Sequence, residues 1–299
     1  MIGRIILVML LWALCYPLIT VGIALSPHLS FATLRAAIAG LVLVGLACAM
    51  GRPFPRGARA WIAVGIIGIG ATSLGFLGMF HAAEFVSPGI ATVIANTQPL
   101  LAAGLGGIVL HETLGTRGRL GLFVGFLGIV VIAAPAILAG GGNSYLIGVA
   151  YIVLAALGIT VSNVTIKRSA ADLDPLMTMG LQLLIGSIPL AIAAGLTEDQ
   201  AAIQWSLTFV AVLLALALFG SALVYVLWMS VLREVPLNKA NVYSFLVPVF
   251  GLTMGFLFYG ESLGPIKLAG IVLAIIGVVL VTGRTALVKA KPSPDLSGF

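Results

Sequence analysis

The chain has 299 residues and a formal net charge of +6; 61% of the residues are hydrophobic and only 8% are charged. This composition, with a mean hydropathy of +1.21, leaves too little polar surface to cover a water-soluble globule and predicts a membrane protein. The basic excess is accounted for by loops next to the membrane, so we expect no nucleic-acid partner.

Apolar windows long enough to cross a membrane recur along almost the whole chain. A transmembrane helix needs about 20 such residues. The windows predict ten spans, at residues 4–25, 31–50, 61–82, 88–110, 119–138, 145–166, 174–194, 205–231, 237–259 and 264–283. The first span is longer than the apolar part of a typical signal peptide and leads directly into the second, so we expect it to be retained.

The positions of Lys and Arg predict how the chain is oriented, because short cytoplasmic loops retain positive charge. These residues lie before the first span, in the second, fourth, sixth and eighth connections, and after the tenth span. The connections around Ser26, Gly141 and Glu198 carry none, and only Lys267 departs from the pattern. Both termini are therefore expected in the cytoplasm.

An internal repeat relates the two halves of the chain. Pro99 and Glu112 recur 149 positions later as Pro248 and Glu261. The same offset relates Ala91 to Ala240, Leu114 to Leu263, Gly121 to Gly270, and Gly128 to Gly277. Five spans per copy is an odd number, so the second copy must be inverted. We expect one five-helix repeat at 1–138, a second at 145–283 and a cytoplasmic tail at 284–299, with a substrate site where the repeats meet.

The repeated residues, together with Trp12 in the first span and the segment Phe31–Arg35 in the second, resemble the drug/metabolite transporter superfamily in its ten-helix, EamA-type exporter branch. The resemblance covers nearly the whole chain. It implies an all-α membrane protein of ten helices in two inverted repeats. By overall character the chain is similar to bacterial exporters of aromatic and other neutral amino acids, which implies a multi-pass protein of the bacterial inner membrane.

Prolines within the predicted spans indicate where the backbone could serve a site. Proline lacks an N–H group and clashes with the carbonyl group four residues earlier. Pro99 and Pro248 therefore free the carbonyl groups of Ala95 and Ser244 near the centres of the fourth and ninth spans. We expect the repeated pair to act as hinges of two gates; kinks that serve only packing are the alternative, as they are for Pro17.

Polar and aromatic side chains gather around these prolines, and polar groups inside membrane spans usually face the interior of the bundle. Met79 and Trp228 are related by the repeat offset, and inversion places them near opposite gates. The predicted substrate-binding residues are Trp12, Tyr16, Met79, Asn96, Asn163, Tyr225, Trp228, Tyr243 and Ser244. Hydrogen bonding between helices, and plain packing for Trp228, are the competing interpretations.

Ionisable residues are scarce inside the predicted spans, and no Asp or Glu lies near a midplane. Facilitated transport is therefore the simplest mechanism and proton antiport the alternative, with His81 and Glu84 as the candidate coupling pair. Arg35 either pairs with a substrate carboxylate or extends to the membrane surface. Glu112 and Glu261 are expected to cap or brace tight turns.

Other classes of membrane protein fit less well. An intramembrane enzyme needs catalytic groups at one depth, whereas the three histidines lie at different helix ends and neither metal-ligand spacing nor an acidic dyad occurs. No catalytic residue, metal or cofactor is predicted. A channel usually needs a symmetric ring of carbonyl or charged groups, and a sugar-phosphate carrier needs a cation at its central site.

The sequence thus predicts a carrier, not an enzyme, that exports small neutral or zwitterionic metabolites by alternating access. Aromatic and neutral amino acids are the expected cargo. Proton-coupled export of other small metabolites or drugs is the alternative. The expected partners are the small-molecule substrate and the lipid bilayer, and both a monomer and a homodimer stay open.

Overall fold

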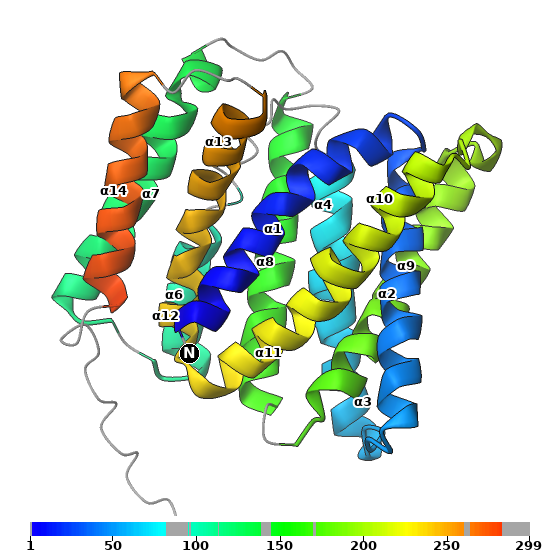
Figure 1. The fold of residues 1–299 in the computed structure, drawn as a ribbon. Coiled ribbons are helices and arrows are strands. Elements are labelled where there is room, and N and C mark those ends of the chain that lie inside the picture. Colours follow the sequence, from blue (N-terminus) through cyan, green and yellow to red (C-terminus); the bar gives the residue numbers. More distant parts are fainter. Residues whose placement is uncertain are drawn as a thin grey trace, which may run out of the picture.

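The structure is a computed structural model that describes residues 2–81, 95, 97–112, 114–138, 145–169, 172–259 and 264–282. Its described elements are helices that run side by side in one bundle (Figure 1). The first half comprises α1 (Ile2–Ile23), α2 (His28–Ala49), α3 (Gly57–Ile67), η1 (Gly68–Leu74), α4 (Gly75–His81), α6 (Gln98–Val109) and α7 (Thr116–Leu138). The second half comprises α8 (Tyr145–Ser169), α9 (Pro175–Thr197), η3 (Gln200–Ala202), α10 (Leu207–Ala217), η4 (Leu218–Leu223), α11 (Val224–Glu234), α12 (Leu237–Val242), η5 (Tyr243–Phe245), α13 (Leu246–Tyr259) and α14 (Pro265–Thr282).

The helices have the length and composition of membrane spans. Within the described residues, seven helices are long and apolar enough to cross a bilayer. They coincide with seven of the predicted spans, and α6, α7 and the run from α12 to α13 overlap the other three. The chain is therefore a multi-pass helical membrane protein, as its composition predicts.

The bundle exposes apolar side chains and buries polar ones, the reverse of a water-soluble protein. Leu41, Ile62 and Phe123 are each more than half exposed, whereas Thr72 and Gln182 are completely buried. Large exposed apolar surfaces indicate contact with another apolar phase, whereas Thr72 and Gln182 are hydrogen-bonded to each other inside the bundle. The core that positions a site is thus partly polar.

Local sequence signals explain where several helices begin. Asp174 precedes α9, and its Oδ1 accepts hydrogen bonds from the backbone N–H groups of Leu176 and Met177, each at 3.0 Å. Pro175 occupies the first position of that helix, where a missing N–H group has no cost. Ser206 caps α10 in the same way by accepting from the N–H group of Phe209 at 3.1 Å. Such caps satisfy donors that the first helical turn leaves free.

Two π-helical segments interrupt long helices at matching places. Gly68–Leu74 (η1) separates α3 from α4, and Leu218–Leu223 (η4) separates α10 from α11. The repeat offset of 149 carries the first segment onto residues 217–223, almost the same positions as the second. Segments of this kind are rare and occur frequently at functional sites. The two halves therefore share an unusual backbone feature at the same place.

Each π-helical segment is held by a polar side chain from the other half. Thr72 of η1 donates from Oγ1 to Oε1 of Gln182 on α9, at 2.8 Å. Ser221 of η4, the offset match of Thr72, accepts from Nε of Arg35 on α2, also at 2.8 Å. The pairs α2 with α9 and η1 with η4 are thus matched both in sequence position and in their contacts.

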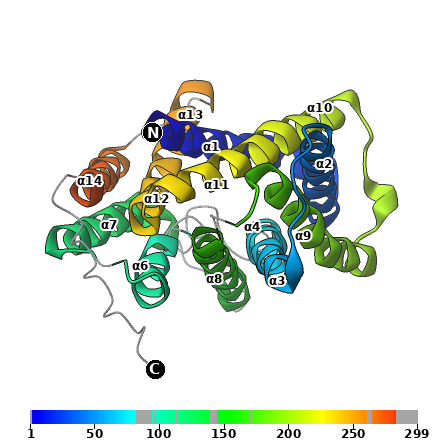
Figure 2. The same cartoon turned by 90° about the horizontal axis from the view of Figure 1, so that it is seen from below.

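Glycines bring α7 and α14 into close contact, and the two helices lie side by side in Figures 1 and 2. A Cβ atom added to Gly277 would lie 2.7 Å from the carbonyl oxygen of Gly121, and one added to Gly270 would lie 2.7 Å from that of Gly128. The offset pairs Gly121 with Gly270 and Gly128 with Gly277, so the contacts run crosswise between the pairs. Crosswise contacts of this kind are typical of a two-fold relation.

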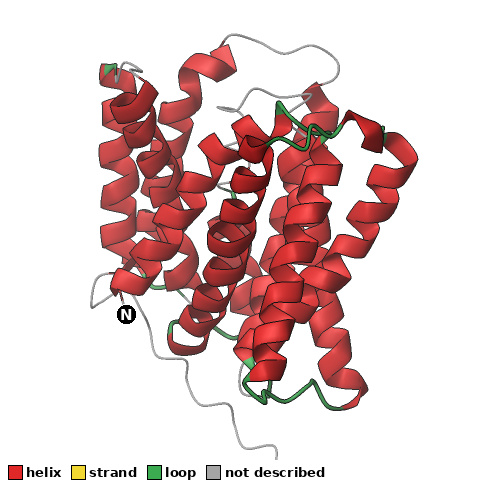
Figure 3. Cartoon of the chain, turned by 45° about the vertical axis from the view of Figure 1, so that its right-hand side comes forward, coloured by secondary structure: helices red, strands yellow, loops and turns green. Residues whose placement is uncertain are grey.

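The figures show which helix ends gather at one end of the bundle. Helix α1 begins and α14 ends at the lower end of Figure 1, and Figure 3 shows the start of the chain at the same end. Helices α2, α8 and α11 end, and α3, α9 and α12 begin, at that end as well. The sequence places basic residues at or between these helix ends, so positive charge is concentrated at one end of the bundle.

Candidate functional site

A largely buried group of aromatic and amide side chains joins helices α1, α8, α11 and α12. We call Trp12, Asn163, Trp228, Asn241 and Ser244 the tryptophan–asparagine cluster. Nε1 of Trp228 on α11 donates to Oδ1 of Asn163 on α8 at 2.9 Å, and Nδ2 of Asn163 donates to Oδ1 of Asn241 on α12 at 3.2 Å. Trp228, Asn163 and Asn241 are each at most 3% exposed.

Trp12 of α1 completes the aromatic side of the cluster. Its ring centroid lies 5.2 Å from that of Trp228, with the ring planes tilted by 59°. Such a pair offers a large apolar surface together with a polar edge. The sequence predicts that Trp12, Asn163 and Trp228 line one site, and the structure brings these three residues together.

A break in the ninth span places the amide side of the cluster. Pro248 cannot donate to the carbonyl group of Ser244, and the chain forms a tight 3₁₀ turn at Tyr243–Phe245 between α12 and α13. Without this break one straight helix would continue through Asn241 and Ser244. The proline that the sequence singles out thus coincides with an interruption of the helix.

Two buried polar atoms of the cluster have no hydrogen-bond partner among the described residues. These are Nδ2 of Asn241 and Oγ of Ser244. An unpaired buried polar atom costs about 1–3 kcal/mol, and it calls for a specific explanation such as a ligand or an ordered water. The cluster can therefore offer a donor amide and a hydroxyl group beside two indole rings.

A buried arginine lies next to this cluster. Arg35 of α2 is 3% exposed. Its Nε donates to Oγ of Ser221 at 2.8 Å, its Nη2 donates to the carbonyl oxygen of Gly220 at 2.9 Å, and its Cζ lies 5.0 Å above the ring of Phe76. The expectation that Arg35 extends to the membrane surface is wrong, because η4 supplies acceptors inside the bundle.

Helical spacing connects Arg35 to the tryptophan–asparagine cluster. Cys15, whose Sγ lies 3.6 Å from Nη2 of Arg35, is three residues after Trp12 on α1. Tyr225 is four residues after Ser221, which Arg35 contacts, and three residues before Trp228 on α11. Residues three or four apart share a face of a helix, so one face of α1 and one face of α11 connect Arg35 with the cluster.

The other predicted site residues have varied positions. Tyr243 is buried in the 3₁₀ turn, whereas Met79 on α4 is 41% exposed and stays a prediction. Pro99 is buried in the first turn of α6, where the N–H group of Leu100 donates to the carbonyl oxygen of Thr97. Helix α6 thus begins at Gln98, one residue before this proline. Asn96, Glu84 and the side chain of Tyr16 lie outside the described residues.

His81 belongs to a second polar group, at the opposite end of the bundle from the chain's start. Nδ1 of His81 lies 3.0 Å from Nε2 of His28, and Nδ1 of His28 lies 3.3 Å from Oε1 of Glu198. The carboxylate of Glu198 accepts the backbone N–H groups of Leu29 and Ser30 at 2.8 and 2.7 Å. Sequence spacing singles out Glu84 as the partner of His81, and it contains no local signal for His28 or Glu198.

Glu112 caps the start of α12, which is one of the two roles, capping or bracing a tight turn, that its position predicts. Its Oε2 accepts the N–H group of Asn238 in α12 at 3.3 Å, and its carbonyl oxygen accepts from the side-chain amide of Asn238 at 3.1 Å. Burial raises the pKa of the Glu112 carboxyl above its ordinary value, against smaller lowering effects from these contacts and from Lys167. Glu112 therefore ties the end of α6 to the segment that carries Asn241.

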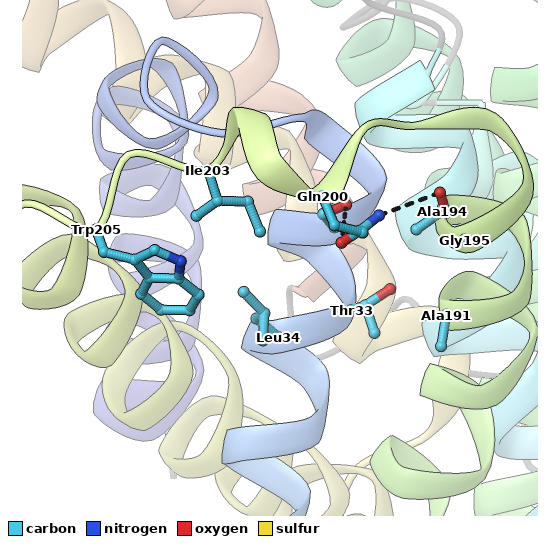
Figure 4. Close-up of a pocket in the computed structure, with 9 residues that line it drawn as sticks. Thr33, Leu34, Ala191, Ala194, Gly195, Gln200, Ile203 and Trp205 are labelled. Atoms are coloured by element: carbon cyan, nitrogen blue, oxygen red, sulfur yellow. Dashed lines mark hydrogen bonds between the residues drawn. The ribbon is translucent and has the colours of Figure 1, made fainter.

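The structure also contains a pocket of about 460 Å³ at the edge of the bundle, between α2, α9 and η3. Figure 4 shows Thr33, Leu34, Ile203 and Trp205 around it, with Gln200 bonded to the carbonyl oxygen of Ala194 at 3.2 Å. Its lining is mostly apolar and includes no charged side chain. Thr33 and Leu34 line this pocket while Arg35 contacts η4, so the pocket and the Arg35 side chain are on different sides of α2.

Comparison with known proteins places both halves of the chain in one family. Residues 2–134 and residues 146–283 each match the EamA-like transporter family. An uncharacterized transporter of Bacillus subtilis, YvbV, is 28% identical over 281 residues, which cover 94% of this chain and 91% of that protein. The uncharacterized inner membrane transporter YedA of Escherichia coli is 26% identical over 97% of this chain and 93% of its own length.

Two further proteins are similar to this chain, one in sequence and one in fold. A chloroplastic WAT1-related protein of Arabidopsis thaliana is 30% identical over 84% of this chain, and the match spans 61% of that longer protein. One crystal structure superposes with a TM-score of 0.81 at 20% sequence identity, covering 93% of this chain and 95% of the other. At this identity the structural likeness concerns the fold alone.

Proposed function

Because the chain belongs to the EamA-like transporter family, we propose that it is an inner-membrane carrier that exports small neutral or zwitterionic metabolites, with aromatic and neutral amino acids as its cargo. The family makes the chain a membrane transporter. The observation that carries the proposal for cargo is the tryptophan–asparagine cluster. It combines two indole rings with an unpaired amide donor of Asn241, the chemistry required by a small molecule with an apolar body and polar ends.

The proposed mechanism is alternating access between two inverted five-helix repeats at 1–138 and 145–283. Its support is the offset match of η1 with η4 and the crosswise glycine contacts of α7 with α14. Inverted repeats commonly place the substrate between interrupted helices, and one repeat rocks against the other. In this proposal Pro99 and Pro248 are the hinges, and both termini face the cytoplasm.

Transport by purified protein in liposomes tests the proposal directly. Counterflow of labelled L-phenylalanine, L-leucine, L-lysine and L-glutamate is measured without a pH gradient. We expect saturable exchange of the first two, and a strong loss of exchange in the variants Trp228→Ala and Asn163→Ala. Leu41→Ala, at a lipid-exposed position, is the matched control and should exchange normally. The proposal fails if no amino acid exchanges, or if the cluster variants behave like the control.

A proton-coupled carrier is the second candidate, and the His28–His81–Glu198 group favours it. The three side chains join the ends of α2, α4 and α9 through contacts of 3.0 and 3.3 Å. Histidine changes charge near physiological pH, so proton uptake there would alter how these ends hold together. Counterflow is repeated with an imposed pH gradient. Gradient-driven accumulation that His81→Gln abolishes would establish coupling, and accumulation that ignores the gradient would leave the facilitated carrier.

A further inference from the structure

We propose that Arg35 is the group that binds the carboxylate of the substrate, so that the cargo is a small organic acid or a zwitterion that retains its acid group. This inference rests on the proposed function, since it assigns a substrate group to the same central site. It goes beyond that function by naming the chemical group that every cargo must share.

The charge balance around Arg35 is the first support. An arginine cannot lose its proton in a protein, and a buried charge is costly unless an opposite charge or several hydrogen bonds compensate it. Arg35 is 3% exposed, yet its partners among the described residues are a hydroxyl group, a carbonyl group, a thiol and an aromatic ring. None of these groups is negatively charged, so the positive charge of Arg35 has no counter-ion among the described residues. One bound anion would balance it.

The geometry of the guanidinium group is the second support. It has five N–H donors in a planar fork. Nε is held by Ser221, and Nη2 by the carbonyl group of Gly220 and by Sγ of Cys15, whereas Nη1 makes no hydrogen bond to a described residue. The π-helical turn thus fixes the plane of the fork and leaves Nη1 available. A carboxylate accepts strong, charge-assisted hydrogen bonds from such a group.

The side chains around Arg35 indicate the chemistry of the rest of the substrate. Phe76 lies against the guanidinium group at 5.0 Å. Tyr225 and Cys15 lead along α11 and α1 to the Trp12–Trp228 pair and the unpaired amide of Asn241. A carboxylate on Arg35 therefore leaves an adjoining apolar body beside the indole rings. This arrangement favours monocarboxylates with an aromatic or aliphatic group over amines and neutral compounds.

Ligand-dependent thermal stability of the full-length protein in detergent tests the assignment independently of transport. The probes are phenylacetate and phenylacetamide, which differ in the charge of one group and little in shape, together with L-phenylalanine. We expect phenylacetate and L-phenylalanine to raise the unfolding temperature, and phenylacetamide to bind at least about tenfold more weakly, because charge-assisted hydrogen bonds are lost. In Arg35→Gln the preference for the acid should disappear, while Arg35→Lys should retain part of it.

The exposed Arg119→Gln is the matched control and should retain the full preference. A role of Arg35 in structure alone would lower the unfolding temperature without ligand but leave the preference for acid over amide intact. That result, an equal effect of acid and amide on the native chain, or no stabilisation by either acid would overturn the assignment. If Arg35→Gln does not fold, the acid and amide comparison on the native chain and on Arg35→Lys still decides.

The two proposals fail in different ways. Counterflow of amino acids with equal exchange of phenylalaninamide would keep the proposed function and reject the role of Arg35. A preference for carboxylate that depends on Arg35, without amino-acid counterflow, would keep the carboxylate site and reject amino acids as cargo.

Discussion

Asn163 shows how a single side chain can organise a site inside a membrane protein. Its oxygen accepts from Trp228 and its nitrogen donates to Asn241, so one amide fixes the orientation of an indole ring and of a second amide. Both bonds join residues far apart in sequence. The effect of removing either bond should therefore appear both in stability and in transport.

Trp228→Phe removes the indole donor and keeps an aromatic ring beside Trp12. Asn163 is left with an unpaired buried oxygen, and we expect the free energy of unfolding to fall by about 1–3 kcal/mol, with a raised KM for counterflow. Trp205→Phe is the matched control, because Trp205 is 63% exposed; it should change stability by less than about 0.5 kcal/mol. Denaturant unfolding in detergent and counterflow measure both quantities. An unchanged KM in Trp228→Phe would count against the site.

The raised pKa of the Glu112 carboxyl predicts that the stability of the protein depends on pH. Burial raises the pKa of its carboxyl in the folded protein above the ordinary value of 4.5, so the folded chain binds the proton more tightly than the unfolded chain. Its contribution to stability is therefore present below the unfolded pKa and is lost as pH rises through the folded pKa. Glu112→Gln should flatten the decline in unfolding temperature above about pH 4.5. The exposed Asp172→Asn should retain it, and identical profiles for native chain and Glu112→Gln would contradict the prediction.

Glycine and proline decide the shapes of the helices more than any polar contact does. Pro248 coincides with the break at Tyr243–Phe245, and the glycines of α7 and α14 allow the two backbones to touch. In lipid, helices gain little from burying apolar surface, so close packing through small residues stabilises their association. The pair α7 and α14 is accordingly one place where an added methyl group should be costly.

Gly277→Ala places a Cβ atom 2.4 Å from Cα of Gly125 and 2.7 Å from the carbonyl oxygen of Gly121. These are backbone atoms that cannot rotate away, so α7 and α14 must separate, and we expect a loss of about 1–3 kcal/mol in the free energy of unfolding. Gly251→Ala, at a helical glycine with no described atom within 4 Å of the added Cβ, is the control and should be neutral or slightly stabilising. Equal unfolding temperatures for the two variants would contradict this packing.

At the scale of the whole molecule, the repeat relates helices that also pack on one another. Offset-matched α2 and α9 pack together, as do α7 and α14, and the basic connections gather at one end of the bundle (Figure 1). The proposed arrangement of two inverted units, related by a pseudo-two-fold axis, accounts for both observations. This proposal predicts that matched connections lie on opposite sides of the membrane.

Single-cysteine labelling measures that orientation. Arg56 follows α2 and Gln204 follows α9, within one residue of offset-matched positions. In a background of Cys15→Ala and Cys48→Ala, a membrane-impermeant maleimide added to intact cells should label Gln204→Cys and not Arg56→Cys, whereas permeabilised cells should show both. Asp172→Cys, between α8 and α9, is expected to behave like Arg56→Cys. Labelling of Arg56→Cys in intact cells would contradict the inverted arrangement and the cytoplasmic termini.

The helices, the repeat and the transporter family follow from properties that lie along the chain. Spans are visible because each one satisfies its backbone polar groups within a single helix and presents a local run of apolar side chains to lipid. The offset of 149 positions that relates Pro99 to Pro248 and Glu112 to Glu261 can likewise be read from the order of residues in the chain. For the same reason Trp12, Asn163 and Trp228 can be selected from the sequence as polar or aromatic residues inside spans.

The partners of those residues were decided only by the tertiary structure. His28 with Glu198, Arg35 with Ser221, and Asn163 with Asn241 are separated by 170, 186 and 78 positions. Whether such residues meet depends on how each helix is rotated and where it is interrupted, and hydropathy in a uniformly apolar span carries little information on rotation. Close packing at glycines and the turns at η1, η4 and η5 set those rotations, and so decide that Arg35 lies buried in the bundle instead of reaching the membrane surface.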